Sequence, residues 1–364
     1  IICADYPELP SGIGDYTHKL VSELRAGNVE VHVITTSHHQ IRADVHTLQV
    51  DWGVASLGRI TRYCREHAIQ FINIQYPAPL YGKYSLVPQL IAIALRLRGY
   101  RLITTLHEFS NNNILRRLSM SVFFVASAAV VMTTRYELHA VLRQFSLFGA
   151  RRIRRKTRII PIGSNLDPCH SPAVEVRAES EIISYFGVFY PSKGAERSIE
   201  IMQDIDQLYP GKYTFRFIGG THPYYQDYFD NFKQQAEQGL ERTEFVLNKP
   251  HTVLAEYICT SHLAVLTYND GVSTRRGSFL AFITSGIPVI TNQGKFSSEL
   301  SEIKGRGMYY SNGHRGTLEK IMEKLRSPEN YIENANVLRT FSARFDFATI
   351  ARMYRSTLNE IGTP

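Results

Sequence analysis

Short apolar runs rich in β-branched residues alternate with amphipathic helical stretches along almost the whole chain. This alternation is typical of parallel sheets that are covered by helices on both faces. The expected strands of the first half cover residues 1–4, 29–35, 71–75, 101–106, 128–133 and 158–162, and those of the second half cover 182–186, 213–218, 244–247, 262–266, 288–291 and 308–310. The pattern predicts an α/β fold with two successive sheets.

Helical periodicity fills the intervals between these runs. Apolar residues recur at helical spacing in residues 16–25 and 85–97. Helices also fit the intervals at 195–206, 224–238, 252–258, 278–284 and 317–324, and we expect a last helix over 347–361. The most apolar segment, residues 120–132, falls short of the roughly 20 residues that a membrane span needs. We interpret it as a buried helix that runs into a strand.

A segment rich in Pro, Ser and charge, residues 164–181, lies between the two series and lacks hydrophobic periodicity. Such a segment is typical of a linker, and 364 residues suffice for two domains with separate cores. We expect a first Rossmann-like domain over 1–166, a linker over 167–181, a second Rossmann-like domain over 182–345, and a helix over 346–364 that crosses back to the first domain. Ligands of doubly wound sheets bind at the carboxyl ends of the strands, so the cleft between two such domains is the expected site.

The chain is basic, with a formal net charge of +8 and a pI of about 9.2. This surplus suits nucleotide phosphates, acidic lipid headgroups or nucleic acid, and does not choose between them. The chain opens on a strand-like Ile-Ile-Cys-Ala without the charged start of a signal peptide. We therefore expect a cytoplasmic protein.

The four cysteines, Cys3, Cys64, Cys169 and Cys259, show neither a CxxC pair nor the spacing of metal ligands. We expect all four to be reduced and mostly buried.

Two segments of the first domain follow predicted strands. Gly12 and Gly14 would let the backbone pass close to a ligand at the N-terminus of the next helix, although a structural tight turn explains a lone GxG equally well. His107 directly follows the strand over 101–106 and could bind a substrate hydroxyl. A histidine that is satisfied at the edge of the core is the alternative.

The second domain opens with a strand, a turn and a helix start that contain Gly187, Lys193 and Gly194. A lysine there can place its ammonium against a diphosphate. The alternative is a solvated lysine, but a cation is unfavourable at the positive end of a helix unless an anion offsets it.

The loop after the strand over 262–266 carries the most informative pattern. Hydroxyl groups, small residues and two arginines precede the helix over 278–284, in the order Tyr268, Asn269, Asp270, Gly271, Val272, Ser273, Thr274, Arg275, Arg276, Gly277 and Ser278. Backbone N–H groups, hydroxyls and guanidinium groups that converge at a helix start form an anion site. A structural loop with solvated arginines is the alternative.

A further basic block precedes the last strand of the first domain, and consists of Arg151, Arg152, Arg154, Arg155, Lys156 and Arg158. It could contact an anionic membrane surface, with roughly 1 kcal/mol for each well-placed cation, or form a solvated loop. Nucleic acid is not expected as a partner, because no aromatic residues are interleaved with these charges.

In their order along the chain, these segments resemble the GT-B-fold retaining glycosyltransferases of family 4. The resemblance includes the glycine loop, the strand that ends at His107, Lys193–Gly194, the turn at Gly219 and the Gly-Ile-Pro run at 286–288. It implies a nucleotide-sugar donor held by Gly187, Lys193, Gly219 and the loop over 273–278, with His107 near the sugar and Gly12 and Gly14 closing on the donor. It also implies a glycan or lipid-linked acceptor. We expect no cofactor, and no metal, because the sequence shows no DxD-like carboxylate pair in a suitable loop to hold one.

The chain departs from the family pattern at three positions. Val188 stands where the family usually has an arginine, and Ser273 and Ala281 stand where it usually has two glutamates. Arg275 and Arg276 would then replace the missing cation, and Asp270 would supply a carboxylate to the sugar. A catalytically degenerate paralogue that serves as a partner subunit, and a sugar-nucleotide epimerase, are the alternatives to a transferase.

Overall fold

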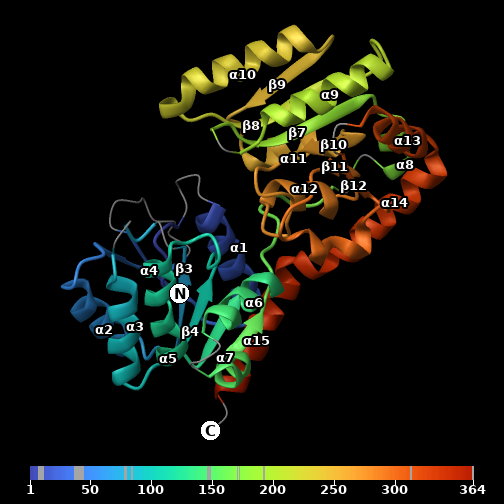
Figure 1. The fold of residues 1–364 in the computed structure, drawn as a ribbon. Helices are drawn as coiled ribbons and strands as arrows, with labels where there is room; N and C mark the ends of the chain where they lie inside the picture. Colours follow the sequence, from blue (N-terminus) through green and yellow to red (C-terminus); the bar gives the residue numbers. More distant parts are fainter. Residues whose placement is uncertain are drawn as a thin grey trace. The chain divides into compact units, whose positions relative to one another are not determined.

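The computed structural model describes residues 1–6, 12–36, 45–77, 80–82, 85–145, 149–169, 171, 173–191, 193–311 and 314–362. The chain forms two compact units, the first made of Ile1–Gly163 and Phe347–Pro364 and the second of Ser164–Asp346. Each unit contains parallel strands covered by helices (Figure 1). The predicted α/β fold with two successive parallel sheets is confirmed.

The first unit contains a four-stranded parallel sheet and a parallel strand pair. The sheet has the order β3 (Phe71–Tyr76), β4 (Arg101–Leu106), β5 (Ala129–Met132), β6 (Thr157–Ile159), and the pair joins β1 (His32–Thr36) to β2 (His46–Val50). Residues 1–4 do not form the expected strand. Ile2 instead makes single bridges to Ile34 of β1 and Ile74 of β3, so this short segment lies between the pair and the sheet.

The helices of the first unit follow the βα alternation. They are α1 (Gly12–Ala26), α2 (Ser56–Glu66), α3 (Val87–Leu97), α4 (Ile114–Ser119), α5 (Ser121–Ala126), α6 (Arg135–Gln144), α7 (Ala150–Lys156) and α15 (Phe347–Gly362). The most apolar segment is α5 running into β5, as predicted, but α5 is not fully buried, since Val125 is 71% exposed. The basic block is not a loop: it forms α7 and the start of β6.

Helix α15 belongs to the core of the first unit although it ends the chain. Its Phe347, Ile350 and Tyr354 are buried against α1. The Tyr354 hydroxyl lies 2.9 Å from Thr105 Oγ1 of β4 and 3.3 Å from the Tyr16 hydroxyl of α1. The helix is therefore fixed by buried hydrogen bonds as well as by apolar contact.

The second unit has six parallel strands in the order β12-β11-β10-β7-β8-β9. Their bounds are β7 (Ile182–Val188), β8 (Thr214–Gly220), β9 (Thr243–Leu247), β10 (Leu263–Leu266), β11 (Val289–Thr291) and β12 (Met308–Tyr310). The chain builds outward from β7 to β9 and then returns to place β10 on the other side of β7. The strand order therefore reverses between β7 and β10, which is the switch point where open α/β sheets bind ligands.

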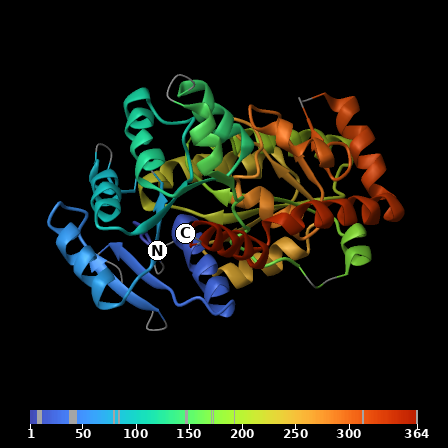
Figure 2. The same ribbon diagram turned by 90° about the horizontal axis from the view of Figure 1, so that it is seen from below.

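The helices of the second unit cover both faces of its sheet (Figure 2). They are α8 (Val174–Ala178), α9 (Glu196–Leu208), α10 (Gln226–Gly239), α11 (His251–Cys259), α12 (Gly277–Thr284), α13 (Arg315–Arg326) and α14 (Pro328–Ser342), with 3₁₀ turns η2 (Pro223–Tyr225), η3 (Ser297–Ile303) and η4 (Ala343–Phe345). No described helix of either unit is long and apolar enough to cross a membrane.

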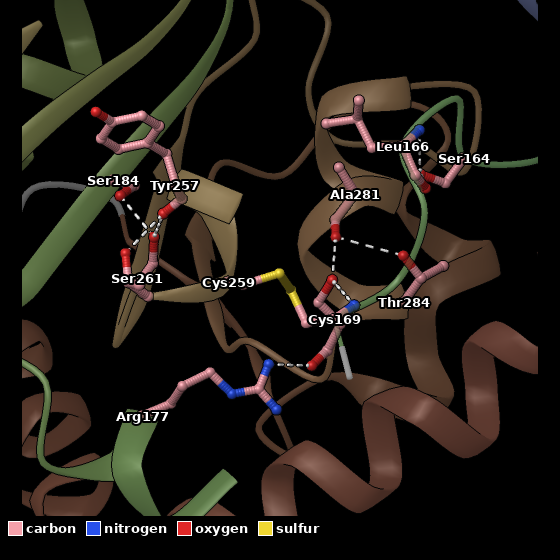
Figure 3. Close-up of a disulfide and its surroundings, with 12 residues drawn as sticks. Ser164, Leu166, Cys169, Arg177, Ser184, Tyr257, Cys259, Ser261, Ala281 and Thr284 are labelled. Atoms are coloured by element: carbon pink, nitrogen blue, oxygen red, sulfur yellow. Dashed lines mark hydrogen bonds between the residues drawn. A yellow bond between two sulfur atoms is a disulfide. The ribbon is translucent and has the colours of Figure 1, made fainter. Parts of the chain in front are cut away.

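A disulfide corrects the expectation that all cysteines are reduced. Cys169 and Cys259 are bonded (Figure 3). Cys3 and Cys64 are free and buried, as expected. The two bonded residues are 90 positions apart, and tertiary structure brings them together. The expected linker packs on the second unit: Cys169 N–H donates to Ser285 Oγ at 3.2 Å, and the buried Arg177 of α8 donates to the Ser285 carbonyl at 2.8 Å.

Candidate nucleotide-binding site

The switch point of the second unit gathers the two segments that the sequence singled out. Lys193 and Gly194 follow β7, and Asp270 to Ser278 follow β10, its neighbour in the sheet. Parallel strands deliver their following loops to the same edge of a sheet. The predicted diphosphate lysine and the predicted cation-rich loop therefore come from adjacent strand ends.

Contacts between Gly194 and the β10 loop hold these segments together. Gly194 has φ +87°, and a Cβ there would lie 2.9 Å from Asn269 Oδ1 and 3.1 Å from Asn269 N. Thr267 Oγ1 donates to the Gly194 carbonyl, and the hydroxyls of Thr267 and Ser198 are 2.8 Å apart. Glycine is required here because a side chain would both strain the backbone and collide with the neighbouring loop.

The charges of the β10 loop partly compensate one another. Arg276 forms an ion pair with Asp270, and its guanidinium group lies 5.0 Å from the centre of the Tyr268 ring. The structure thus gives Asp270 an arginine partner, in addition to the sugar contact expected from the sequence. The Arg276 side chain is therefore not simply solvated, as the alternative of a structural loop would have it.

A second cationic cluster lies on Phe296. The Arg275 guanidinium group and the Lys295 ammonium group lie 5.0 and 5.1 Å from the centre of this ring. Lys193 occupies a similar position 4.9 Å from the centre of the Tyr190 ring. Aromatic faces stabilise the cations by about 0.5–1 kcal/mol at exposed sites and hold the charged groups in place without neutralising them.

Helix α12 begins within this loop and supplies backbone donors. The N-cap residue is Arg276, and among the described residues its side chain makes no capping hydrogen bond. A Cβ on Gly277 would meet nothing within 4 Å, so the first turn opens onto free space. The N–H groups of a first turn have no partner inside the helix and carry the positive end of its dipole. They can bind a phosphate.

Tyr268 and Asn292 fix the shape of the loop. The Asn292 side-chain amide accepts from Tyr268 N–H at 2.8 Å and donates to the Tyr268 carbonyl at 2.7 Å. The Tyr268 hydroxyl lies 2.8 Å from Ser278 Oγ in the first turn of α12. Burial raises the pKa of Tyr268 to about 12, so this phenol stays neutral and keeps the hydrogen bond at physiological pH.

Two glycines at the ends of β7 and β8 bring their backbones close together. Gly187 pairs with Gly219, and a Cβ on Gly219 would collide with the Gly187 carbonyl oxygen. A Cβ on Gly187 would lie 2.9 Å from the Tyr185 hydroxyl. Both glycines are therefore explained by packing within the sheet. Val188, where the resembled family usually has an arginine, is 47% exposed.

The positions that would carry the family's two glutamates are closed to solvent. Ser273 and Ala281 are both 2% exposed. An ionised carboxylate at such a depth would need partners for its charge. Thr274 is also buried, so within this loop the more accessible groups are Arg275, Arg276, Gly277 and Ser278.

Sequence reasoning missed two residues that shape this site, Asn292 and Lys295, and it included Tyr268 and Asn269 in the predicted loop without giving either a role. Tyr268 and Asn269 closely follow β10, and Asn292 directly follows β11, so each lies at a strand end where ligands of such folds bind. Their position after a predicted strand was the sequence feature from which a role in the site could have been predicted. The contact of Asn269 with Gly194 could not be inferred, because it depends on the pairing of β7 with β10.

The candidate residues of the first unit are His107, Gly12 and Gly14. His107 is buried directly after β4; its Nε2–H donates to Gln75 Oε1 at 2.7 Å, and its ring meets Tyr16 edge-on with centres 5.4 Å apart. These contacts favour the alternative of a histidine fixed at the core edge, and orient its other nitrogen as an acceptor. Gly12 and Gly14 lie in the first turn of α1, not in a loop before it.

Neither a cluster of metal-ligating side chains among the described residues nor a cavity found in the first unit coincides with these positions. No group of three or more His, Cys, Asp and Glu side chains among the described residues could hold a metal ion. A cavity of about 470 Å³ is lined by residues at the starts of β1 and β3, including His32, Phe71 and Ile72, and by none of the candidate residues. It lies at the amino ends of the strands, opposite to the edge that binds ligands in such sheets.

Comparison with solved structures defines the fold class: the chain has the GT-B fold, with two parallel-sheet α/β units in succession. Anabaena HepE, solved with UDP, superposes with a TM-score of 0.71 at 17% identity over 99% of both chains. A glycosyltransferase from Rickettsia africae gives 0.75 at 12% identity, covering 100% of this chain and 98% of its own. No family model and no curated protein matches the sequence.

Sucrose-phosphate synthase from Thermosynechococcus elongatus has the same arrangement, with a TM-score of 0.68 at 17% identity over 97% of this chain and 94% of its own. At such identities the likeness establishes the fold. What the chain does must be argued from its own residues.

Proposed function

We propose that the chain is a glycosyltransferase that moves a sugar from a nucleotide-diphosphate donor to a hydroxyl acceptor, with retention of configuration and without a metal ion. The observation that carries this proposal is the meeting of Lys193–Gly194 with the β10 loop at the switch point of the second unit. Lys193, Arg275, Arg276 and the first turn of α12 belong to these two segments, and cations together with backbone N–H groups are the chemistry that a pyrophosphate requires.

The solved proteins that share the fold support the choice of donor. HepE structures contain UDP or UDP-glucose, and a trehalose-6-phosphate structure from E. coli contains UDP-2-fluoro glucose. We infer that this chain also takes a nucleoside diphosphate sugar. At Gly187 and Gly219 the protein backbone would contact the donor. Ser273, Thr274, Gly277 and Ser278 would belong to the loop that surrounds the donor.

In the proposed glycosyl transfer, the site acts by stabilising the negative charge that develops on the diphosphate. The bond between the anomeric carbon and the diphosphate oxygen breaks, the acceptor oxygen bonds to the same face of the sugar, and the acceptor proton passes to the departing phosphate. Negative charge grows on the diphosphate as the bond breaks. Preorganised donors aimed at it lower the barrier. Lys193, Arg275, Arg276 and the first turn of α12 are those donors.

His107 would lie near the sugar of the donor. Gly12 and Gly14 would let the N-terminus of α1 approach the donor. The acceptor proposed here is a glycan or a lipid-linked precursor. We also propose that the protein works in the cytoplasm, at the inner face of the membrane.

Calorimetry with UDP, GDP, dTDP and ADP tests the proposal. We expect one of these to bind, and we expect Lys193→Gln and Arg275→Gln each to weaken that binding at least tenfold, because each removes one full charge from the site. Arg326→Gln is the matched control, since Arg326 also lies on an aromatic ring, 5.4 Å from the centre of Tyr209, at the end of α13.

The alternative functions make different predictions for the same titration. A degenerate partner subunit would bind none of the four nucleotides. An epimerase would bind UDP but would convert the UDP-sugar without an acceptor, which product analysis detects. Arg275→Gln and Lys193→Gln enzymes with unchanged turnover would overturn the proposed mechanism.

A further inference from the structure

The first unit exposes large apolar side chains on three consecutive helices. Leu97 is 81% exposed, Leu115 is 76% and Val125 is 71%. The complete set is Leu86, Leu90, Ile93 and Leu97 at helix α3, Ile114, Leu115 and Leu118 on α4, and Val125 on α5. We call these eight residues the α3–α5 surface. Isolated exposed apolar residues are ordinary, but a cluster marks an interaction site.

Helix α3 is apolar on both faces. Ile91, Ala92 and Leu95 are buried against the domain. Residues 86, 90, 93 and 97 recur at intervals of four, three and four, so their side chains form a second stripe on the outer face. A helix that is apolar all round is normally covered on every side. The outer stripe of α3 therefore lacks its covering partner within the described part of the chain.

Helices α3, α4 and α5 are neighbours, so their exposed residues belong to one region. Gln89 of α3 donates to Ser119 of α4 at 3.1 Å, and Arg116 of α4 donates to the carbonyl of Ser85, just before α3, at 3.0 Å. Helix α3 also packs along α5, and Figure 1 shows the two helices side by side.

The exposed residues are held in place by hydrogen bonds. Buried Glu137 accepts from the N–H groups of Phe109 and Ser110 at 3.2 and 2.8 Å, which fixes the loop before α4. The Asn113 side chain then caps α4 by accepting from Arg116 N–H at 2.9 Å. A fixed apolar protrusion binds at a lower entropic cost than a flexible one.

Positive charge surrounds this surface. Lys156 at the end of α7 donates to the carbonyls of Phe124 and Ser127 at the end of α5, at 3.0 and 2.7 Å. The pKa of Lys156 is lowered mainly by burial and further by the positive charges of Arg152, Arg96 and Arg155. These three guanidinium groups therefore lie near the ammonium group that contacts the end of α5. Arg151, Arg152, Arg154 and Arg155 of α7 are all exposed.

The sequence around these helices carries almost no acidic residues. Residues 67–166 contain fourteen Lys and Arg against two Asp and Glu, so this segment has a surplus of twelve positive charges while the rest of the chain has a deficit of four. One of the two acids, Glu137, is buried. The positive surplus of the protein thus falls in the sequence segment that contains α3 to α7.

We propose that the α3–α5 surface inserts into the interfacial region of an anionic phospholipid bilayer, with α7 bound to the headgroups. Apolar side chains flanked by arginines, with few acidic residues among them, match a bilayer whose interior is apolar and whose headgroups are negatively charged. The inference extends the membrane contact proposed for the basic segment, because it assigns the insertion to α3 and α4. It does not depend on glycosyl transfer.

Co-sedimentation of the full chain with vesicles tests the inference. We expect binding to vesicles of phosphatidylcholine with about 30% phosphatidylglycerol, and at least tenfold weaker binding to phosphatidylcholine alone, because the headgroup attraction is then absent. The triple variant Leu90→Gln, Leu97→Gln, Leu115→Gln should lose at least tenfold in affinity for the anionic vesicles. The control triple variant Val54→Gln, Val176→Gln, Tyr224→Gln removes three exposed apolar side chains elsewhere and should bind like the parent.

A tryptophan probe reports insertion directly. The fluorescence of Leu115→Trp should shift to shorter wavelength with anionic vesicles. The emission of a Val54→Trp control should not shift. This result would show that the shift requires a tryptophan on the α3–α5 surface. Circular dichroism and nucleotide calorimetry on the same variants should match the parent, which separates this inference from the proposed activity.

Three outcomes would overturn the insertion. The parent chain does not pellet with anionic vesicles; the triple α3–α4 variant pellets as well as the parent, which leaves the arginines alone as the contact; or the same variant abolishes a dimer seen by sedimentation, which makes a second copy the occupant. Loss of nucleotide binding with intact vesicle binding would contradict the proposed function and leave this inference standing.

Discussion

Gly194 lies directly against Asn269, so that a Cβ on the glycine would come within 2.9 Å of the amide oxygen. This contact joins the segment after β7 to the segment after β10. It connects two predicted pieces of an anion site that are far apart in sequence. Space and backbone conformation both exclude any residue but glycine at position 194.

Replacement of Gly194 by alanine tests that relationship. Gly194→Ala should lower stability by roughly 1–3 kcal/mol, because φ is +87° and the added methyl group meets Asn269. Gly305→Ala is the matched control, since Gly305 has φ +73° and a Cβ there would meet nothing within 4 Å. Urea unfolding measures both. Equal losses would mean that the contact with Asn269 contributes nothing beyond backbone strain.

Asp270→Asn distinguishes an ion-pair partner from a sugar-binding carboxylate. The Asp270–Arg276 pair is partly exposed, so its loss should cost no more than about 1 kcal/mol of stability. Without its carboxylate partner Arg276 is a stronger anion ligand, and we expect nucleoside diphosphate affinity to rise a few-fold in calorimetry. A fall in affinity for the diphosphate would contradict this role.

Reduction of the Cys169–Cys259 disulfide should destabilise the second unit. The bond joins residues 90 positions apart, and bonds of this kind contribute roughly 2–4 kcal/mol. Thermal unfolding should therefore begin at a lower temperature in dithiothreitol. The Cys169→Ser, Cys259→Ser protein should not respond to the reductant, whereas Cys3→Ser, Cys64→Ser should respond like the parent. An equal response of both double variants would place the effect elsewhere.

Buried His262 should make the protein sensitive to acid. Its Nδ1–H donates to the Arg177 carbonyl at 3.1 Å and its ring stacks on Tyr331, and burial lowers its pKa from 6.5 to about 4. The unfolded chain therefore binds a proton that the folded chain does not bind between these two values. Stability should fall as the pH drops from about 6.5 towards 4, by up to roughly 3 kcal/mol.

His262→Asn removes the titrating ring while an amide can still donate to the Arg177 carbonyl. Urea unfolding at a series of pH values should show that this variant loses less stability than the parent between about pH 6.5 and 4. His251→Asn, on the exposed start of α11, is the control and should follow the parent. Parallel curves for the parent and His262→Asn would show that another group titrates.

The sheet architecture can be predicted from the sequence because apolar strands alternate with amphipathic helices. The pattern predicts β4 to the residue and finds every strand from β7 to β12. It does not find β2, since residues His46–Val50 are mostly half-exposed and lack a buried run. It predicts a strand over residues 1–4 that the structure does not contain. In this short segment only Ile2 pairs with described strands, through single bridges to β1 and β3.

The candidate site can be predicted as segments but not as contacts. Strand-end position points to Lys193 and to the loop with Arg275 and Arg276. Which side chains compensate those charges depends on how the loop folds: Arg276 pairs with Asp270 of the same loop, and Phe296 and Lys295 arrive from the segment after β11. For the same reason nothing in the cysteine spacing reveals the disulfide.

The inclusion of α15 in the first unit has a consequence for biosynthesis. Phe347 packs on Gly163, where a Cβ would lie 2.5 Å from the ring, and Tyr354 completes the buried hydroxyl cluster with Tyr16 and Thr105. The core of the first unit therefore cannot close until α15 has been synthesised, whereas the second unit, which precedes α15 in the sequence, already has all its described strands by then. A chain that lacked α15 would leave the apolar residues of α1 that contact this helix without their partner, and such surfaces promote aggregation.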